Sequence, residues 1–131
     1  MPTVDTNLLV RYVVRDDEAQ LLMVQDLVRD CIRLQQSLYV PVTVALELEW
    51  VLRSSFGYDK NTVMGVLSDL LCAAELRFES ERALEVALHQ FRNGRVEFAD
   101  CVHVALAMQA GEVPLWTFDT RAAKISGARL L

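Results

Sequence analysis

The sequence has little of what builds a disulfide framework, a zinc site or a membrane anchor. Its three cysteines, Cys31, Cys72 and Cys101, are odd in number, lie far apart and lack the short spacing of paired metal ligands. Each lies in a helical apolar pattern, which favours buried free thiols over disulfides or zinc ligands. The longest apolar run, around residues 42–52, is broken by two glutamates and is too short to cross a bilayer.

Basic residues are also in the minority. The net charge of −5 argues against a broad basic surface for nucleic acid. If four carboxylates form one cluster, the rest of the chain carries a charge of only −1, so most of the acidity could belong to one site that binds divalent cations. No charged leader followed by an apolar stretch and a small-residue cleavage site opens the chain, and we therefore expect a cytoplasmic protein.

The 131 residues, 53% hydrophobic and 24% charged, are typical of one globular domain, which we place at residues 1–131. Short apolar runs alternate with helical patterns, so we predict an α/β fold with a central, mostly parallel sheet of four to five short strands flanked by helices. Asp17 is well placed to cap the first long helix, and Gly111 to end a later one. The predicted strands end at Asp5 and cover residues 37–41, 76–78, 114–118 and 129–131; the predicted helices cover residues 8–14, 18–36, 43–54, 61–74, 81–91, 98–110 and 119–124.

Two aspartates follow predicted strands directly. Asp5 ends the first apolar run, and we expect Thr6 or Asn7 to cap the helix that follows. Ligands of open α/β sheets bind at the carboxyl ends of strands, where this places Asp5. Asp119 repeats the pattern between a strand and a helix. Each aspartate could equally serve as a turn residue or a helix cap.

Two glutamates compete for a role on the helix at residues 43–54. The helical neighbours of Glu47 form a largely apolar face, where a carboxylate is costly unless it meets a cation or a hydrogen-bonding cavity. Glu49 has Arg53 four residues later, the favourable spacing of an exposed ion pair. We therefore expect Glu47 to be functional and Glu49 structural. The helix is apolar all round, however, so the two could exchange roles.

The fourth acid, Asp100, lies in the first turn of the helix that opens at Phe98. The helix dipole favours a negative group there in any protein. Glu97 is nearer the start and could cap the helix instead. That would free Asp100, whose neighbours Val104 and Ala107 mark an inward face.

Carboxylates that cluster without cationic partners repel one another, and metal ions relieve this repulsion. Hard oxygen ligands select Mg²⁺ or Mn²⁺ over zinc. The chemistry that such a cluster indicates is the attack of a metal-activated water on a phosphodiester.

In four blocks the sequence resembles the PIN-domain nucleases, most closely the VapC-like toxins of type II toxin–antitoxin pairs. The blocks lie at residues 4–12, 46–52, 98–107 and 117–119, and the resemblance spans essentially the whole chain. Each block is loose alone, but their order and spacing together are fairly specific. The blocks contain, in turn, VDTNLLVRY, LELEWVL, FADCVHVALA and TFD.

The resemblance implies an acidic quartet, with Asp5 and Asp100 as central metal ligands and Glu47 and Asp119 completing or orienting the site. Asn7 and Thr117 match polar positions beside the metals. It further implies an endoribonuclease dependent on Mg²⁺ or Mn²⁺, a homodimer, and a cognate antitoxin that inhibits it. The substrate expected is RNA, with no membrane association and no DNA binding by this chain alone.

The remaining polar and aromatic residues have simpler interpretations. We expect His103, three residues after Asp100, to be a satisfied core histidine rather than a site residue. Solvent exposure is the expectation for four basic residues that could otherwise meet phosphate, and core positions for the two tryptophans. These residues are Arg11, Arg15, Arg121 and Lys124, and Trp50 and Trp116.

Two other functions compete with a nuclease. An acidic-pocket phosphotransferase or receiver-like domain also places aspartates at strand ends around magnesium. The segment after Asp5 lacks the second aspartate that such a phosphatase needs, and the strand at Leu38–Val40 offers no phosphoacceptor. A non-catalytic module, whose acids hold a structural ion or a basic peptide, is the other alternative.

Overall fold

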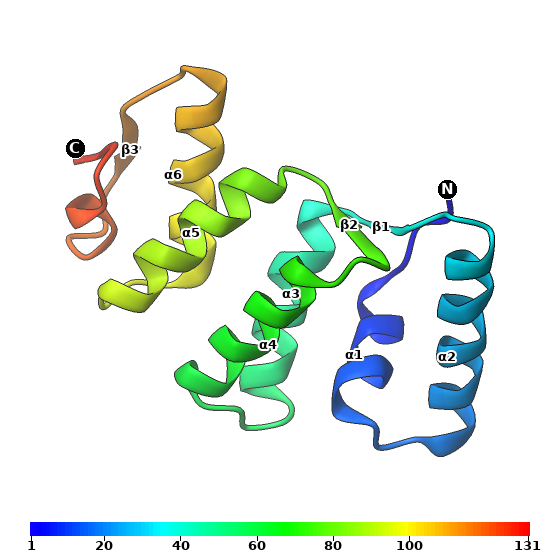
Figure 1. Cartoon of the computed structure of the whole chain (residues 1–131). Helices are drawn as coiled ribbons and strands as arrows, with labels where there is room; N and C mark the ends of the chain where they lie inside the picture. The colour runs from blue at the N-terminus through cyan, green and yellow to red at the C-terminus, as the bar shows by residue number, and fades with distance from the viewer. The chain divides into compact units, whose positions relative to one another are not determined.

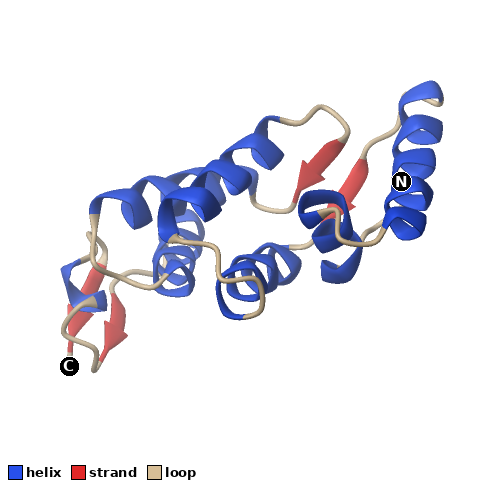
Figure 2. Cartoon of the chain, turned by 90° about the horizontal axis from the view of Figure 1, so that it is seen from below, coloured by secondary structure: helices blue, strands red, loops and turns tan.

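The computed structural model describes all of residues 1–131, which form two compact units, residues 1–79 and residues 80–131. Each unit combines helices with a pair of short parallel strands (Figure 1, Figure 2). The α/β class and the parallel direction of the strands are therefore confirmed. The strands hydrogen-bond two by two, one pair in each unit, and not as the single central sheet that we predicted.

In unit 1, strand β1 (Leu38–Val40) pairs with strand β2 (Leu76–Phe78), so that Leu38 lies opposite Leu76 and Val40 opposite Phe78. The predicted first strand is reduced to a single parallel bridge between Thr3 and Tyr39. The N–H of Val4 donates to the Tyr39 carbonyl at 3.0 Å. The bridge cannot lengthen because the chain turns into a helix directly after residue 5.

Four helices complete unit 1: α1 (Thr6–Val14), α2 (Glu18–Arg33), α3 (Val42–Ser54) and α4 (Lys60–Cys72). Asp17 caps α2 as predicted, because its carboxylate accepts a hydrogen bond from the N–H of Gln20. That helix ends three residues before the predicted boundary, since Gln35 has a φ of 55°, in the left-handed region. The core contains the fully buried leucines 9, 38, 48 and 52. Burying each such side chain contributes roughly 1.5–3 kcal/mol.

Helix α3 begins after Pro41, which has no side chain able to cap the free N–H groups of the first turn. The carboxylate of Glu79, which follows strand β2, accepts a hydrogen bond from the N–H of Val42 at 2.8 Å. This bond fixes the start of α3 to the end of β2, and it thereby helps to position Glu47 and Glu49 of that helix.

Unit 2 contains helices α5 (Glu81–Asn93) and α6 (Phe98–Ala110), strands β3 (Leu115–Thr117) and β4 (Ala128–Leu130), and a short 3-10 helix, η1 (Ala122–Lys124). Helices α5 and α6 pack against each other, and the rings of Phe91 and Phe98 meet edge to face with centroids 5.5 Å apart. Helix α6 has the predicted bounds and ends at Gly111, whose φ of 74° places it in the left-handed conformation.

One cysteine and both tryptophans are exposed, contrary to expectation. Cys72, at the last position of α4, is exposed, whereas the other two cysteines are buried as predicted. Trp50 and Trp116 are 60% and 54% exposed. Each tryptophan ring lies beneath a guanidinium group, that of Arg53 at 5.6 Å and that of Arg129 at 5.7 Å. Such cation–π contacts let large rings remain at the surface. None of the helices combines the length and apolar character that crossing a bilayer requires.

Candidate active site

Asp5 is the N-cap of helix α1. Its backbone is extended, and its Oδ1 accepts a hydrogen bond from the N–H of Leu8 at 2.9 Å. The expectation that Thr6 or Asn7 caps this helix is therefore wrong, because the helix already begins at Thr6. The Asp5 side chain is exposed, and its second carboxylate oxygen accepts no hydrogen bond from the protein. Capping thus fixes the carboxylate while one oxygen stays available to a cation.

Glu47 reaches the same place from helix α3. Its Oε1 accepts a hydrogen bond of 2.5 Å from the hydroxyl of Thr6, which is only 8% exposed. Thr6 directly follows Asp5 in the chain, so this hydrogen bond ties Glu47 to the residue next to Asp5. The sequence interpretation missed this role of Thr6. A hydroxyl residue directly after a strand-end aspartate was the only signal for it.

Glu49 forms the predicted ion pair with Arg53, whose Nε lies 2.6 Å from Oε2. The expected exposure was wrong, because Glu49 is 3% exposed whereas Glu47 lies at the surface. A carboxylate is tolerated in such a buried position only when it is paired and hydrogen-bonded, and Arg53 provides both. We therefore interpret Glu49 as structural, as expected, but its ion pair is buried and not exposed.

In unit 2, Asp100 lies in the first turn of α6 and is half-buried. Burial raises the pKa of the Asp100 carboxyl above its usual value, and the charges of Asp119 and Glu97 add to this shift. The charge of His103 opposes this shift. Asp119, Glu97 and His103 are therefore close enough to Asp100 to affect its pKa. His103 is exposed, and the expectation of a core histidine is wrong.

Asp119 is held by a tight turn between β3 and η1. Its N–H donates to the hydroxyl of Thr117 at 3.0 Å, and its Oδ1 accepts from the N–H groups of Arg121 and Ala122 at 2.7 and 3.3 Å. Asp119 is therefore a cap as well as a neighbour of Asp100. Thr117, predicted to stand beside the metals, contacts this aspartate directly and fixes its backbone.

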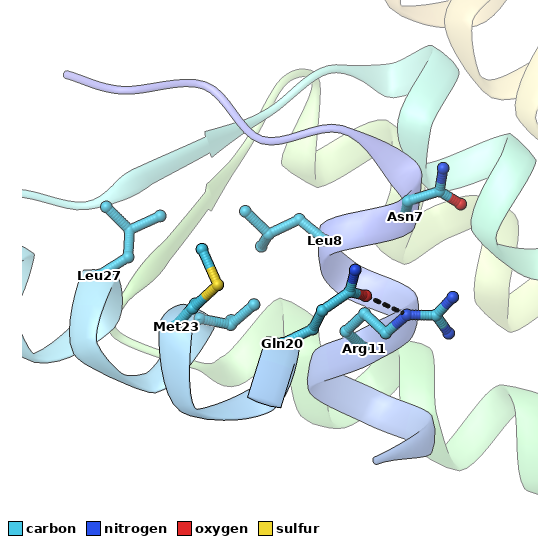
Figure 3. Close-up of a pocket in the computed structure, with 7 residues that line it drawn as sticks. Asn7, Leu8, Arg11, Gln20, Met23 and Leu27 are labelled. Atoms are coloured by element: carbon cyan, nitrogen blue, oxygen red, sulfur yellow. Dashed lines mark hydrogen bonds between the residues drawn. The ribbon is translucent and has the colours of Figure 1, made fainter. Parts of the chain in front are cut away.

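Asn7 is exposed and lines a cavity of about 350 Å³ between α1 and α2. Figure 3 shows Leu8, Met23 and Leu27 pointing toward one another across this space. The Nε of Arg11 donates to Oε1 of Gln20 at 2.6 Å at its edge, and an Arg11 Nη pairs with Asp16 at 2.9 Å. Arg11 is therefore engaged within the protein rather than free for phosphate. Arg15, the exposed C-cap of α1, keeps its predicted place at the surface.

Two of the four predicted acids thus lie in each unit. In unit 1, Glu47 is hydrogen-bonded to Thr6, the residue after Asp5, and in unit 2 the charge of Asp119 acts on Asp100. No group of three or more acidic, histidine or cysteine side chains that could hold a metal ion forms within either unit. Mg²⁺ is commonly bound through only one or two carboxylates, with water and phosphate oxygens as its other ligands. Each pair has the donor chemistry that this ion prefers. The convergence of both pairs on one site remains a prediction.

Comparison with known families adds the decisive observation. Residues 3–128 match the PIN domain. This chain is a member of the PIN domain family. PIN domains are generally nucleases that use divalent metal ions, and the match includes both pairs of acids. No curated protein matches the chain.

Proposed function

We propose that this PIN domain is an endoribonuclease dependent on Mg²⁺ or Mn²⁺, with Asp5, Glu47, Asp100 and Asp119 as its metal-binding acids. The observation that carries the proposal is the family match over residues 3–128, which contains all four acids. Two contacts support it: Glu47 is hydrogen-bonded to Thr6, next to Asp5 in the chain, and the charge of Asp119 acts on Asp100.

The bound ion would supply an activated water and charge neutralisation at the phosphodiester. The chain's own residues prepare the oxygens that hold it. The Thr6 hydroxyl orients Glu47, the N–H of Leu8 orients Asp5, and Thr117 fixes the turn that carries Asp119. The raised pKa of Asp100 indicates that its charge is poorly solvated, and a cation would stabilise that charge.

The experiment that tests this function is cleavage of labelled single-stranded RNAs in the presence of Mg²⁺ or Mn²⁺. We expect Asp5→Asn and Asp100→Asn each to abolish cleavage, and a chelator to do the same to the wild type. Asp26→Asn is the matched control, because Asp26 is an exposed acid of α2 paired only with Arg29. Cleavage that survives either site substitution, or that ignores the chelator, would reject the mechanism.

A thermal melt with metal separates catalysis from simple ion binding. Binding of Mg²⁺ or Mn²⁺ to the folded state alone raises the melting temperature. A nuclease should show both the rise and RNA cleavage. If the metal raises the melting temperature while every RNA remains uncut, the alternative of a non-catalytic binding module is supported instead.

The resemblance to VapC-like toxins extends the proposal to a biological role: a homodimeric toxin silenced by an antitoxin. The cavity between α1 and α2 supports this role, because its lining includes the exposed apolar side chain of Met23, and Leu22 of the same helix is exposed as well. An apolar segment of the antitoxin would lie there, as amphipathic peptides lie in grooves. A basic side chain of the antitoxin entering the acidic site would inhibit by displacing the metal.

The partner test uses the product of the neighbouring reading frame. We expect that product to co-purify with this chain and to suppress its RNA cleavage. Met23→Asp, at the exposed edge of the cavity, should weaken the complex without changing RNA cleavage by the free protein, because Met23 is 71% exposed. A neighbouring product that neither binds nor inhibits would reject the toxin role and leave the nuclease proposal standing.

A further inference from the structure

A second cavity, of about 510 Å³, lies wholly within unit 2 between the α5–α6 connection and η1. Its volume lies within the range of roughly 300–1,000 Å³ typical of ligand sites. The lining contains three cationic side chains and two amides but no carboxylate. The cationic residues are Arg95, Arg121 and Lys124, and the amides are Gln90 and Asn93.

The three cations are unpaired. The ion pairs of the chain involve Arg11, Arg29, Arg33 and Arg53, none of which lines this cavity. Three like charges that share one concave surface repel one another, and an anion relieves that repulsion. Each of these side chains is exposed, so each could simply be solvated on its own. The amide of Asn93 already donates to the His89 carbonyl, which leaves Gln90 as the amide donor of the lining. The convergence of the three cations from segments about 26 residues apart favours a binding site over three independent surface charges.

The cavity adjoins one of the candidate metal ligands. The N–H of Arg121 donates to Oδ1 of Asp119 at 2.7 Å, so a cavity-lining residue and the acid belong to the same turn. An anion held by the Arg121 side chain would therefore be bound by a residue of the turn that carries Asp119. A guanidinium group binds phosphate through two parallel N–H bonds, and a lysine contributes a point charge.

We propose that this cavity binds a backbone phosphate of single-stranded RNA next to the scissile bond. This inference rests on the proposed function for the identity of the polymer. The net charge of −5 argues against a broad basic surface for nucleic acid, but a local basic site is sufficient to position a substrate on an acidic protein.

The test measures RNA binding without cleavage. A fluorescently labelled single-stranded RNA is titrated with the protein in chelator at several salt concentrations, and affinity is read by anisotropy. The variants are Arg95→Gln, Arg121→Gln and Lys124→Gln. The matched control is Arg92→Gln, which removes the same charge from an exposed position on α5 outside the cavity. Circular dichroism melts confirm that each variant remains folded.

Each phosphate contact contributes about 0.7 to the slope of log K against log salt for single strands. Loss of this one phosphate contact should therefore lower the slope by about 0.7 and weaken binding about fivefold at 0.1 M salt, and each cavity variant should show a loss up to that limit. The Arg92→Gln control should keep the wild-type slope. Cavity variants that behave like this control, or a wild type that binds no RNA, would overturn the inference.

The same titration distinguishes failure of this inference from failure of the proposed function. A protein that binds RNA through the cavity but never cleaves it with metal refutes the nuclease and keeps the phosphate site. A protein that cleaves RNA while all three cavity variants bind like the control refutes the phosphate site alone.

Discussion

Replacing each of the two glutamates of α3 by alanine should have opposite effects on stability and on activity. In Glu49→Ala, the guanidinium group of Arg53 loses the carboxylate of Glu49 and keeps its contact with the Trp50 ring, while its side chain is only 29% exposed. Removing one member of a buried ion pair costs about 3–5 kcal/mol. Partial access of Arg53 to water lowers this estimate to about 2–3 kcal/mol. In Glu47→Ala, the main loss is one hydrogen bond from Thr6, worth about 1 kcal/mol.

Equilibrium unfolding in urea measures the free energy of unfolding of each variant, and variants are compared only where the dependence on urea concentration has the same slope. RNA cleavage measures activity. We expect Glu49→Ala to lose stability and to retain cleavage wherever it remains folded. Glu47→Ala should lose cleavage and only about 1 kcal/mol of unfolding free energy, less than Glu49→Ala. The assignment of roles would be refuted if Glu47→Ala were the more destabilised variant, or if Glu49→Ala unfolded within 1 kcal/mol of the wild type.

Three further predictions follow from single contacts. Because burial raises the pKa of Asp100, its ionised form costs stability at neutral pH. Asp100→Asn in chelator should therefore have a higher melting temperature than the wild type at pH 7. This difference in melting temperature should shrink as the pH falls toward 3.8, the ordinary pKa of an aspartate. The hydrogen bond from Thr62 lowers the pKa of Asp59, so Asp59→Ala should be destabilised in urea titrations at pH 7, with the difference lost as the pH falls below 3.8. Thr6→Val should reduce RNA cleavage about tenfold or more, because Glu47 loses its orienting donor, while a urea titration shows a stability loss of about 1 kcal/mol.

Much of the helical structure could be predicted because its signals are local. The cap at Asp17 and the terminating glycine at residue 111 fix helix ends through contacts within a few residues. The strands were harder to predict, since each has three residues and depends on a partner far away in the sequence. The run before Asp5 resembled a strand, and only the early start of α1 limits it to one bridge.

The type and order of the four acids in the sequence were sufficient to select them as candidates, but not to predict their environments. Helix α3 is apolar around its whole circumference, so spacing alone could not tell whether Glu47 or Glu49 is buried. The exposure of Trp116 depends on the position of Arg129, which is a tertiary contact. The basic cavity was likewise invisible in the sequence, because Arg95 meets the residues of η1 only after the chain folds.

The first turn of α1 serves two neighbours at once. The backbone of Leu8 holds the carboxylate of Asp5, and Leu8 also lines the cavity that faces α2. An occupant of the cavity that shifts the backbone of Leu8 would therefore move the donor that holds this candidate metal ligand. Thermodynamic reciprocity then requires that the ion alter the occupant's affinity by the same factor. A partner bound in the α1–α2 cavity would thus inhibit through helix α1, without entering the acidic site.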